Sequence, residues 1–284
     1  MVKVQGRLQV VATPIGNLGD LSARARDVLQ HADGIVAEDT RHTLALLHSL
    51  GISRPLISLH THNETQRVPQ LLARLVAGET LALVSDAGTP LLSDPGYELA
   101  CAAADAGIRI EAIPGASAIT TALACAALPV NRFCFEGFLP ARQRERRAQL
   151  AGLADESRTL VFFEAPHRIA EMLSDLAAVF GAGRRATVTR ELTKTHESVY
   201  RGTLGELAER ALEDENIRRG ELTVVVQGAP EQPQPVDQAL LRRAVELLAR
   251  ELPPSRAAAL AAQLTGASRS AAYALLTQHE RRQS

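Results

Sequence analysis

The stretch at residues 81–96, LALVSDAGTPLLSDPG, constrains the fold more than any other part of the chain. LALVS is a short apolar run without polar alternation, which is typical of a strand buried on both faces of a parallel sheet. Where it ends, Asp86, Ala87, Gly88 and Thr89 leave backbone groups accessible. Ligands bind at that edge in open α/β folds, so we expect a binding turn here; a tight turn without a ligand is the alternative. Residues 93–95 are expected to cap the next helix.

Four more short apolar runs in the first half of the chain precede small or polar residues, at 8–12, 34–37, 56–59 and 108–113. The segments between and after these runs predict helices near 22–30, 40–50, 64–77, 97–106 and 118–127. Strands that alternate with helices predict a parallel sheet. We therefore expect an α/β lobe over residues 1–128, with polar residues gathered at the carboxyl ends of its strands.

The pattern changes after Leu128. Strands are predicted at 133–138, 159–165, 186–192, 197–203 and 221–228, with helices near 143–154, 167–180 and 204–215. The last strands follow one another without long helices between them, so we expect a mixed sheet in a second lobe, 129–229.

A Pro- and Gln-rich linker at 228–236 leads to a helical tail, 237–284. Helices are predicted near 237–251, 254–264 and 269–280. The break at Thr265–Ser268 makes the last two resemble a helix-turn-helix, although short helix pairs are also common packing units.

Composition narrows the class of protein. Of the 284 residues 46% are hydrophobic but only 3% are aromatic, so a sizeable core must be built mainly from aliphatic side chains. A formal net charge of −1 gives no overall basic field, so any nucleic-acid binding needs a local patch. Three cysteines without C-x-x-C spacing are expected to be reduced thiols of a cytoplasmic protein. We expect neither a signal peptide nor a membrane span.

Two clusters of polar residues invite a ligand. His60 and His62 form an H-x-H pair, but no further ligand follows at a fixed spacing, so we expect no metal site. The segment PARQRERR carries four arginines and one acid, which makes it the best candidate for contacting phosphate groups; a solvated helix face is the alternative. The candidate contacts are Arg142, Arg144, Arg146 and Arg147.

The order of motifs resembles one family closely. TPIGNLGD, AEDTRHT, LVSDAGTPLLSDPG, IPGAS, FEGFLP, FFEAPHR, RELTKTHE and GELTVVVQG are similar to segments of the ribosomal RNA small-subunit methyltransferase I family, within the tetrapyrrole-methylase superfamily. The resemblance runs from about Leu8 to the tail. It implies a two-lobed tetrapyrrole-methylase-like fold, a homodimer, and S-adenosylmethionine-dependent 2′-O-methylation of a cytidine in small-subunit (16S) ribosomal RNA. The partner would be that RNA or the small ribosomal subunit.

The resemblance also implies where the methyl donor binds. In this superfamily, backbone at strand ends holds the cofactor in the cleft between the lobes. The matching positions in this sequence are Pro14, Asp86, Ala87, Gly88, Thr89, Ser117, Ala118, Glu164 and Leu192. One departure is IPGAS, where relatives often have PGP; Ala116 is expected to relax that turn slightly without removing the site.

Methyl transfer to a ribose hydroxyl requires in-line geometry, and a base or a cation that favours the alkoxide. Asp39, His167 and Lys194 are the candidates, because each follows a predicted strand. His167 is expected to head a helix, which favours a neutral base, and Lys194 to stabilise the oxyanion. Structural alternatives remain open: a helix cap for His167, an ion pair with Arg41 for Asp39, and a surface cation for Lys194.

Three rival functions fit parts of this pattern. A tetrapyrrole C-methyltransferase or a diphthine synthase would use the same donor cleft, but would not need the EDTRHT, RELTKT and arginine segments. A non-catalytic RNA-binding module would bind no methyl donor. Copurified coloured tetrapyrrole would favour the first rival, and titration with S-adenosylmethionine would identify the third.

Overall fold

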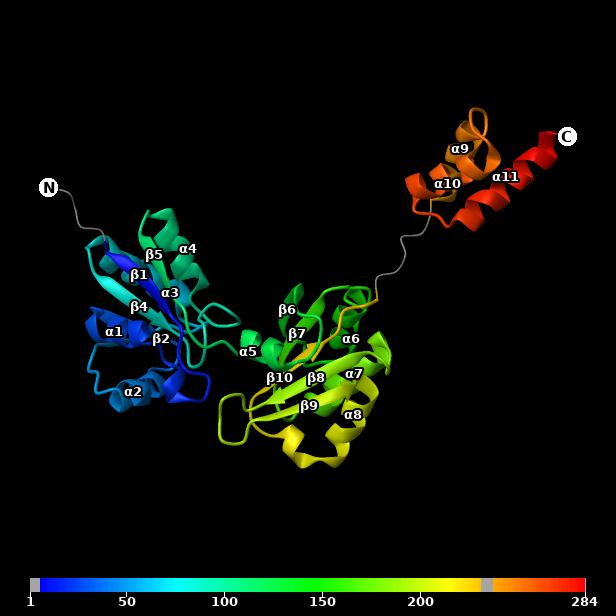
Figure 1. Ribbon diagram of the computed structural model, residues 1–284. Coiled ribbons are helices and arrows are strands. Elements are labelled where there is room, and N and C mark those ends of the chain that lie inside the picture. Colours follow the sequence, from blue (N-terminus) through cyan, green and yellow to red (C-terminus); the bar gives the residue numbers. More distant parts are fainter. Residues whose placement is uncertain (1–5, 231–236, 284) are drawn as a thin grey trace. The chain divides into compact units, whose positions relative to one another are not determined.

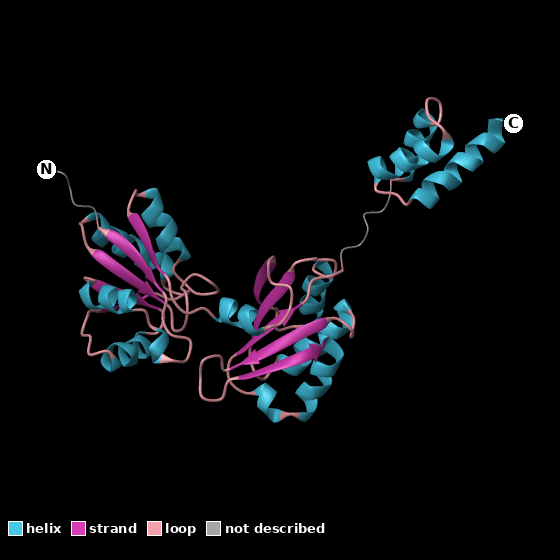
Figure 2. Cartoon of the chain, viewed as in Figure 1, coloured by secondary structure: helices cyan, strands magenta, loops and turns pink. Residues whose placement is uncertain are grey.

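The computed structural model describes residues 6–230 and 237–283; residues 1–5, 231–236 and 284, including most of the predicted linker, lie outside the described part (Figure 1). The chain divides into two units, 1–229 and 230–284. The first unit contains both predicted lobes, each with its own sheet (Figure 2). In the described part, no helix combines the length and the apolar character needed to cross a membrane.

The N-terminal lobe is a parallel five-stranded sheet with strand order β3-β2-β4-β1-β5, as the alternating pattern predicted. The strands are β1 (Arg7–Val11), β2 (Gly34–Ala37), β3 (Leu56–Ser58), β4 (Thr80–Val84) and β5 (Arg109–Ile113). The helices are η1 (Leu18–Asp20), α1 (Ala23–His31), α2 (Thr40–Ser49), α3 (Glu64–Val76) and α4 (Tyr97–Asp105).

Both faces of this sheet are buried along the three central strands, β2, β4 and β1. One face packs with α1 and α2 through residues such as Val11, Leu29 and Leu47. The other face packs with α3 and α4 through residues such as Leu8 and Leu71. Burial on both faces explains why the strands read as unbroken apolar runs in the sequence.

The second lobe has a mixed sheet, also as predicted, with strand order β6-β7-β10-β8-β9 and only β6 and β7 parallel. Its strands are β6 (Phe133–Phe138), β7 (Thr159–Glu164), β8 (Arg185–Arg190), β9 (Ser198–Thr203) and β10 (Leu222–Val226). Its helices are α5 (Ala118–Cys125), α6 (Gln143–Gly152), α7 (Ile169–Phe180), α8 (Leu204–Glu213) and η2 (Glu215–Arg218).

Helix α5 follows β5 of the N-terminal lobe in the sequence but packs against the sheet of the second lobe. Ile119, Ala122 and Leu123 pack against Val161 and Val225 of the second sheet. By this packing we assign α5 to the second lobe, which then begins near Ala118 and not after the predicted boundary at residue 128. Small residues along α5 allow this close approach to the sheet.

The tail unit consists of α9 (Gln238–Leu248), α10 (Pro254–Thr265) and α11 (Arg269–Gln283). Its core contains Leu241, Val245 and Leu276, together with several alanines of α10 and α11. Gly266, with φ 71°, ends α10 in the left-handed conformation that favours glycine. This is the predicted helix-turn-helix-like break.

A buried carboxylate holds the start of α4. Glu64, 9% exposed, accepts hydrogen bonds from the backbone N–H groups of Gly96 (2.9 Å) and Glu98 (3.1 Å). The predicted cap from residues 93–95 is wrong, because the N-cap residue is Gly96 and its partner comes from α3. The loop after β4 is thus tied to α3 at its far end.

We expect Glu64→Ala to lower the free energy of unfolding by about 1–3 kcal/mol, because it leaves two N–H donors, the one of Gly96 buried, without their acceptor. Urea unfolding of the purified protein measures this loss. Gln66→Ala, at an exposed position of the same helix, is the control and should change stability by no more than about 0.5 kcal/mol. Equal stabilities of the two variants would contradict the proposed cap.

Candidate functional site

The loops that follow β1 and β4 are joined by a small antiparallel bridge. Thr13 N–H donates to the Gly88 carbonyl (2.9 Å), and Gly88 N–H donates to the Thr13 carbonyl (3.1 Å). Gly88 has φ +81°, and a Cβ there would lie 3.3 Å from Ile15 Cγ2. The tight bridge therefore depends on a glycine.

The loop after β5 joins the same framework. Thr89 Oγ1 donates to the Ala116 carbonyl (3.3 Å), and Ser117 is the N-cap residue of α5. Three loops from neighbouring strands are thereby held together at the carboxyl edge of the N-terminal sheet, facing the second lobe.

A cavity of about 430 Å³ lies between these loops and the second lobe. We call it the acidic cavity, because four carboxylates line it: Asp86, Asp94, Glu164 and Glu221. The remaining wall is largely apolar and includes Phe138, Phe163 and Ala118. A cavity with this lining favours a ligand that is both cationic and partly apolar.

Glu164 is the most constrained group in the acidic cavity. It is 2% exposed, and its Oε1 accepts from Ala165 N–H (2.8 Å) and lies 3.2 Å from Arg168 Nε. No hydrogen-bond partner for its Oε2 is found among the described residues. Burial raises the pKa of Glu164, and burial likewise raises the pKa of Asp94. An unpartnered buried carboxylate oxygen is costly, and a cationic ligand would offset that cost.

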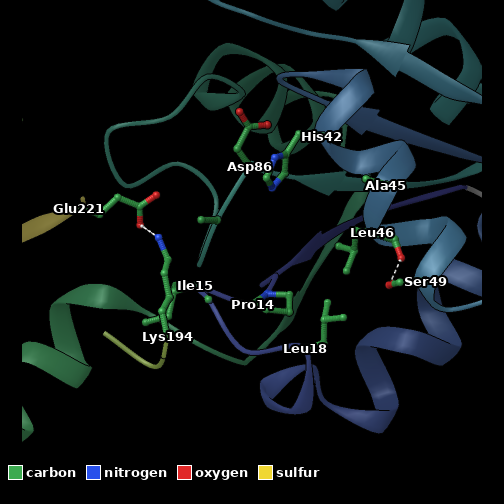
Figure 3. A pocket seen from close by; sticks show the side chains of 12 residues that line it. Pro14, Ile15, Leu18, His42, Ala45, Leu46, Ser49, Asp86, Lys194 and Glu221 are labelled. Atoms are coloured by element: carbon green, nitrogen blue, oxygen red, sulfur yellow. Dashed lines mark hydrogen bonds and ion pairs between the residues drawn. The ribbon is translucent and has the colours of Figure 1, made fainter. Parts of the chain in front are cut away.

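A second cavity, of about 340 Å³, adjoins the first (Figure 3). We call it the lysine cavity. Pro14, His42, Ser49 and Lys194 lie on its walls. It shares four wall residues with the acidic cavity: Ile15, Asp86, Ala87 and Glu221. The two cavities therefore form one site with an acidic chamber and a chamber that contains a cation.

Lys194 enters this site from the loop after β8 (Figure 3). Its Nζ lies 3.0 Å from Glu191 Oε1 and 3.1 Å from Glu221 Oε2. Burial lowers the pKa of Lys194, but the hydrogen bonds to Glu191 and Glu221 more than offset this and raise the pKa overall. The side chain is therefore an ammonium ion at neutral pH, suited to stabilise negative charge and not to accept a proton.

The loop that carries Lys194 is strained. Glu191 (φ 50°) and Thr193 (φ 67°) both adopt the left-handed conformation, which is uncommon for a residue other than glycine and is an outlier for a β-branched one. Glycines make room for the loop on both sides: a Cβ at Gly16 would collide with the Lys194 stem, and one at Gly220 would lie 2.5 Å from Glu191. The position of Lys194 is thus fixed from both lobes.

Comparison with known proteins identifies the family. The sequence model of the tetrapyrrole (corrin/porphyrin) methylases matches residues 7–208, and that of the RsmI C-terminal HTH domain matches residues 235–280. The ribosomal RNA small subunit methyltransferase I of Xylella fastidiosa is 55% identical over 271 residues, which cover 94% of this chain and 98% of that protein. This chain belongs to the ribosomal RNA small subunit methyltransferase I family. It is therefore a methyltransferase.

Solved structures confirm the fold that the motifs predicted. The methyltransferase CobJ is 19% identical and superposes with a TM-score of 0.60 over 79% of this chain and 95% of its own. Uroporphyrin-III C-methyltransferase from Thermus thermophilus, crystallised with S-adenosylhomocysteine, is 18% identical with a TM-score of 0.55, over 78% and 97% of the two chains. At these identities the likeness establishes the tetrapyrrole-methylase fold alone.

The residues that the family resemblance assigned to the donor fall into two groups. Some line the cavities: Asp86 and Ala87 lie on both, Pro14 on the lysine cavity, and Ala118 and Glu164 on the acidic cavity. Others belong to the framework behind these walls. Gly88, Thr89 and Ser117 hold the three loops together, and Leu192 is buried among apolar residues that include Ile15 and Ile119.

The predicted catalytic residues of this methyltransferase do not gather in one place. Asp39 caps α2 and is paired with Arg41 (2.7 Å); the Arg41 hydrogen bonds hold the pKa of Asp39 far below its usual range. This is the structural alternative for Asp39, and it makes a poor base. His167 is exposed in the turn before α7 and lies on neither cavity wall. Of the three, only Lys194 lines one of these two cavities.

Sequence reasoning missed His42. It lies in the first turn of α2, one turn after β2 ends, and lines the lysine cavity with Asp86 (Figure 3). The signal was present in AEDTRHT, one of the motifs that carried the resemblance. The motif alone does not show which of its polar side chains reaches the cavity.

The structure contradicts the predicted phosphate contact of Arg146. Its side chain is 0% exposed, and its Nε lies 2.7 Å from Asp175 Oδ2. Arg147, half exposed, contacts the other oxygen of the same carboxylate (2.6 Å). The two arginines of α6 thus pair with the buried Asp175 carboxylate of α7, which would be costly to bury as an unpaired charge. Arg142 and Arg144 remain exposed.

We expect Arg146→Met to lower the free energy of unfolding by about 3–5 kcal/mol, since it leaves the Asp175 charge buried with a single cation beside it. Denaturant unfolding provides the measurement. The control is Arg144→Met, at an exposed position of the same helix, with a change of no more than about 0.5 kcal/mol. An Arg146→Met protein of unchanged stability would contradict a structural role for this ion pair.

Proposed function

We propose that this protein uses S-adenosylmethionine to methylate the 2′-oxygen of a cytidine ribose in small-subunit (16S) ribosomal RNA. The observation that carries the proposal is the pair of adjoining cavities between the lobes, one lined by four carboxylates and the other reached by the Lys194 ammonium group. The name of the 55% identical relative supports ribosomal RNA as the substrate. The motif resemblance supports the cytidine ribose.

The acidic cavity suits the methyl donor. S-adenosylmethionine carries a sulfonium and an ammonium cation, and the unpartnered Oε2 of buried Glu164 offers a counter-charge. Asp86 and Asp94 add further negative charge from the N-terminal lobe. Phe138 and Phe163 provide apolar surface for the adenosine.

The lysine cavity suits the ribose that accepts the methyl group. The bound donor supplies an electrophilic methyl group on a good leaving group, so the protein mainly has to position the two reactants. The Lys194 ammonium stabilises negative charge that develops on the ribose oxygen. His42 lines the same cavity, and its imidazole accepts the hydroxyl proton. Asp86, shared by both cavities, orients the ligands at their junction.

We also propose RNA contacts outside the site, a cytoplasmic location and a homodimer. RNA contacts beyond the site would come from Arg142 and Arg144, with Arg147 partly available. The cysteines, all unbonded in the structure, support a reducing, cytoplasmic location. Light scattering of the purified protein measures its molar mass in solution and so tests the proposed homodimer.

The decisive experiment is methylation of small-subunit RNA by the purified protein with labelled donor, followed by mapping of the modified nucleotide. Label on a cytidine 2′-oxygen is the expected result, whereas label on another atom would overturn the assignment. A copurified coloured tetrapyrrole would favour the C-methyltransferase alternative, and methylation of a protein in place of RNA would favour a diphthine synthase. A titration with S-adenosylmethionine that shows no heat would favour an RNA-binding module.

In this assay we expect Lys194→Met to lower kcat about 100-fold, because the charge that stabilises the developing oxyanion is lost. The KM for the donor should change little, since Lys194 does not line the acidic cavity. Arg185→Met, which removes an exposed cation of the second lobe that lines neither cavity, serves as the control, with kcat within about threefold. A kcat of Lys194→Met close to that of the unchanged protein would exclude the proposed role.

Donor affinity should rise with pH. Burial raises the pKa values of Glu164 and Asp94, so these carboxyls ionise only as pH climbs above their ordinary ranges, and only the ionised forms attract a sulfonium cation. Glu164→Gln should weaken S-adenosylmethionine binding about tenfold at pH 8 and flatten its pH dependence. Calorimetric titration measures both. S-adenosylhomocysteine, which lacks the sulfonium charge, is the control ligand. Its affinity should change less with pH and with Glu164→Gln. Equal changes in the affinities of the two ligands would contradict the assignment.

A further inference from the structure

We propose that a groove on the N-terminal lobe, separate from the site between the lobes, binds phosphodiester groups of the RNA substrate. The groove is a cavity of about 440 Å³ along β5 and α1, and it shares no wall residue with the acidic or the lysine cavity. We call it the arginine groove; Gln9, Arg24, Arg109 and Glu111 line it. The inference rests on the proposed RNA substrate.

The arginine groove has an excess of positive charge. Glu111 is its single carboxylate, and it lies 2.9 Å from Arg109 Nε and 3.5 Å from Arg7 Nη1. The hydrogen bond from Gln9 Nε2 (2.9 Å) and the neighbouring arginines hold the pKa of Glu111 below its usual value. With Arg24, three guanidinium groups surround one carboxylate. The surplus charge attracts an anion.

Arg24 is fixed in place without being neutralised. Its Nη2 donates to the Ala112 carbonyl at 2.7 Å, which uses one of the five N–H donors of the guanidinium group and none of its charge. The arginine is therefore anchored over the groove with donors left for a ligand. Guanidinium groups bind phosphate oxygens well because they present paired donors.

The strand edge adds neutral donors. β5 is an edge strand, with β1 on one side and no other strand of the described part on the other. The Ile113 carbonyl accepts from Ala12 N–H and so faces β1, whereas the Ala112 carbonyl faces Arg24. By alternation, the N–H groups of Ile110 and Ala112 also point outward, into the groove that both residues line.

An extended polymer fits this groove better than a discrete small anion. The Arg109 side chain is 76% exposed and that of Arg7 is 49% exposed, so the charges lie along an open surface. From Arg109 to Ile113 the strand runs about 13 Å toward the loop that carries Ser117. The RNA backbone would therefore lie along β5.

Charged residues on a strand edge also prevent unwanted strand pairing, and that purpose alone would require no ligand. RNA binding distinguishes the two readings. We therefore compare two full-length double variants of equal net charge. Arg24→Gln with Arg109→Gln changes the groove. Arg26→Gln with Arg67→Gln changes exposed arginines of α1 and α3 that line none of the three cavities.

We expect the groove variant to bind small-subunit RNA more weakly than the control variant, with the slope of log K against log salt reduced by about 1–2 units. Both variants should keep the melting temperature and the S-adenosylmethionine affinity of the unchanged protein. If Arg24→Gln lowers the melting temperature, Arg109→Gln alone, at the more exposed position, replaces the pair, with an expected slope change of about 1.

Equal salt slopes for the groove and control variants would overturn the proposal. So would inhibition by inorganic phosphate that is lost in the groove variant while RNA affinity is unchanged, because the site would then take a small anion. Labelled methyl transfer to saturating RNA tests the proposed function separately from the proposed role of the groove. If the unchanged protein transfers no methyl group to RNA, the proposed function fails; if it does and the slopes agree, only the groove fails.

Discussion

The two hydrogen bonds between Thr13 and Gly88 join the first and fourth loops of the N-terminal sheet, and the arrangement of the site depends on them. They place Ile15, from one loop, next to Asp86 and Ala87, from the other, and these three residues line both cavities. The bridge closes only because Gly88 adopts a positive φ with Ile15 packed against it. A backbone contact, without any catalytic group, thus determines where the two chambers meet.

Charge is distributed unevenly around this junction. Carboxylates gather in the cavity proposed for the donor, a single lysine with its carboxylate partners reaches the neighbouring one, and arginines line the groove on β5. In partly buried surroundings such charges interact more strongly than at an open surface. A nearly neutral chain can therefore offer a cation and a polyanion separate binding places. The formal net charge of −1 concealed this arrangement.

The order and type of the strands and helices were predictable because strands buried on both faces leave unbroken apolar runs, as in LALVS and TLVFFE. Side-chain partners were not predictable, since they come from distant segments. Asp175, which buries Arg146, lies 29 residues further along the chain, and nothing in PARQRERR marks which arginine turns inward. The cap of α4 likewise comes from Glu64, 32 residues earlier.

The candidate site was predictable at its backbone and less so at its side chains. Strand-end loops are identified by small residues, and Asp86, Ala87 and Ala118 indeed line the cavities. Which polar side chain points inward depends on helix phase: Asp39 turns back to cap its own helix, while His42 lines the lysine cavity. Periodicity alone does not fix that phase at a helix start.

The packing of α5 against the second sheet has a mechanical consequence. Within residues 6–229 the chain passes from one lobe to the other a single time, through the four residues between Ile113 and Ala118. Any change in the angle between the lobes has to be absorbed by torsions of this short tether. Ala116 and Ser117 also belong to the loops that frame the site. A change in the angle between the lobes therefore also changes the shape of the cavities between them.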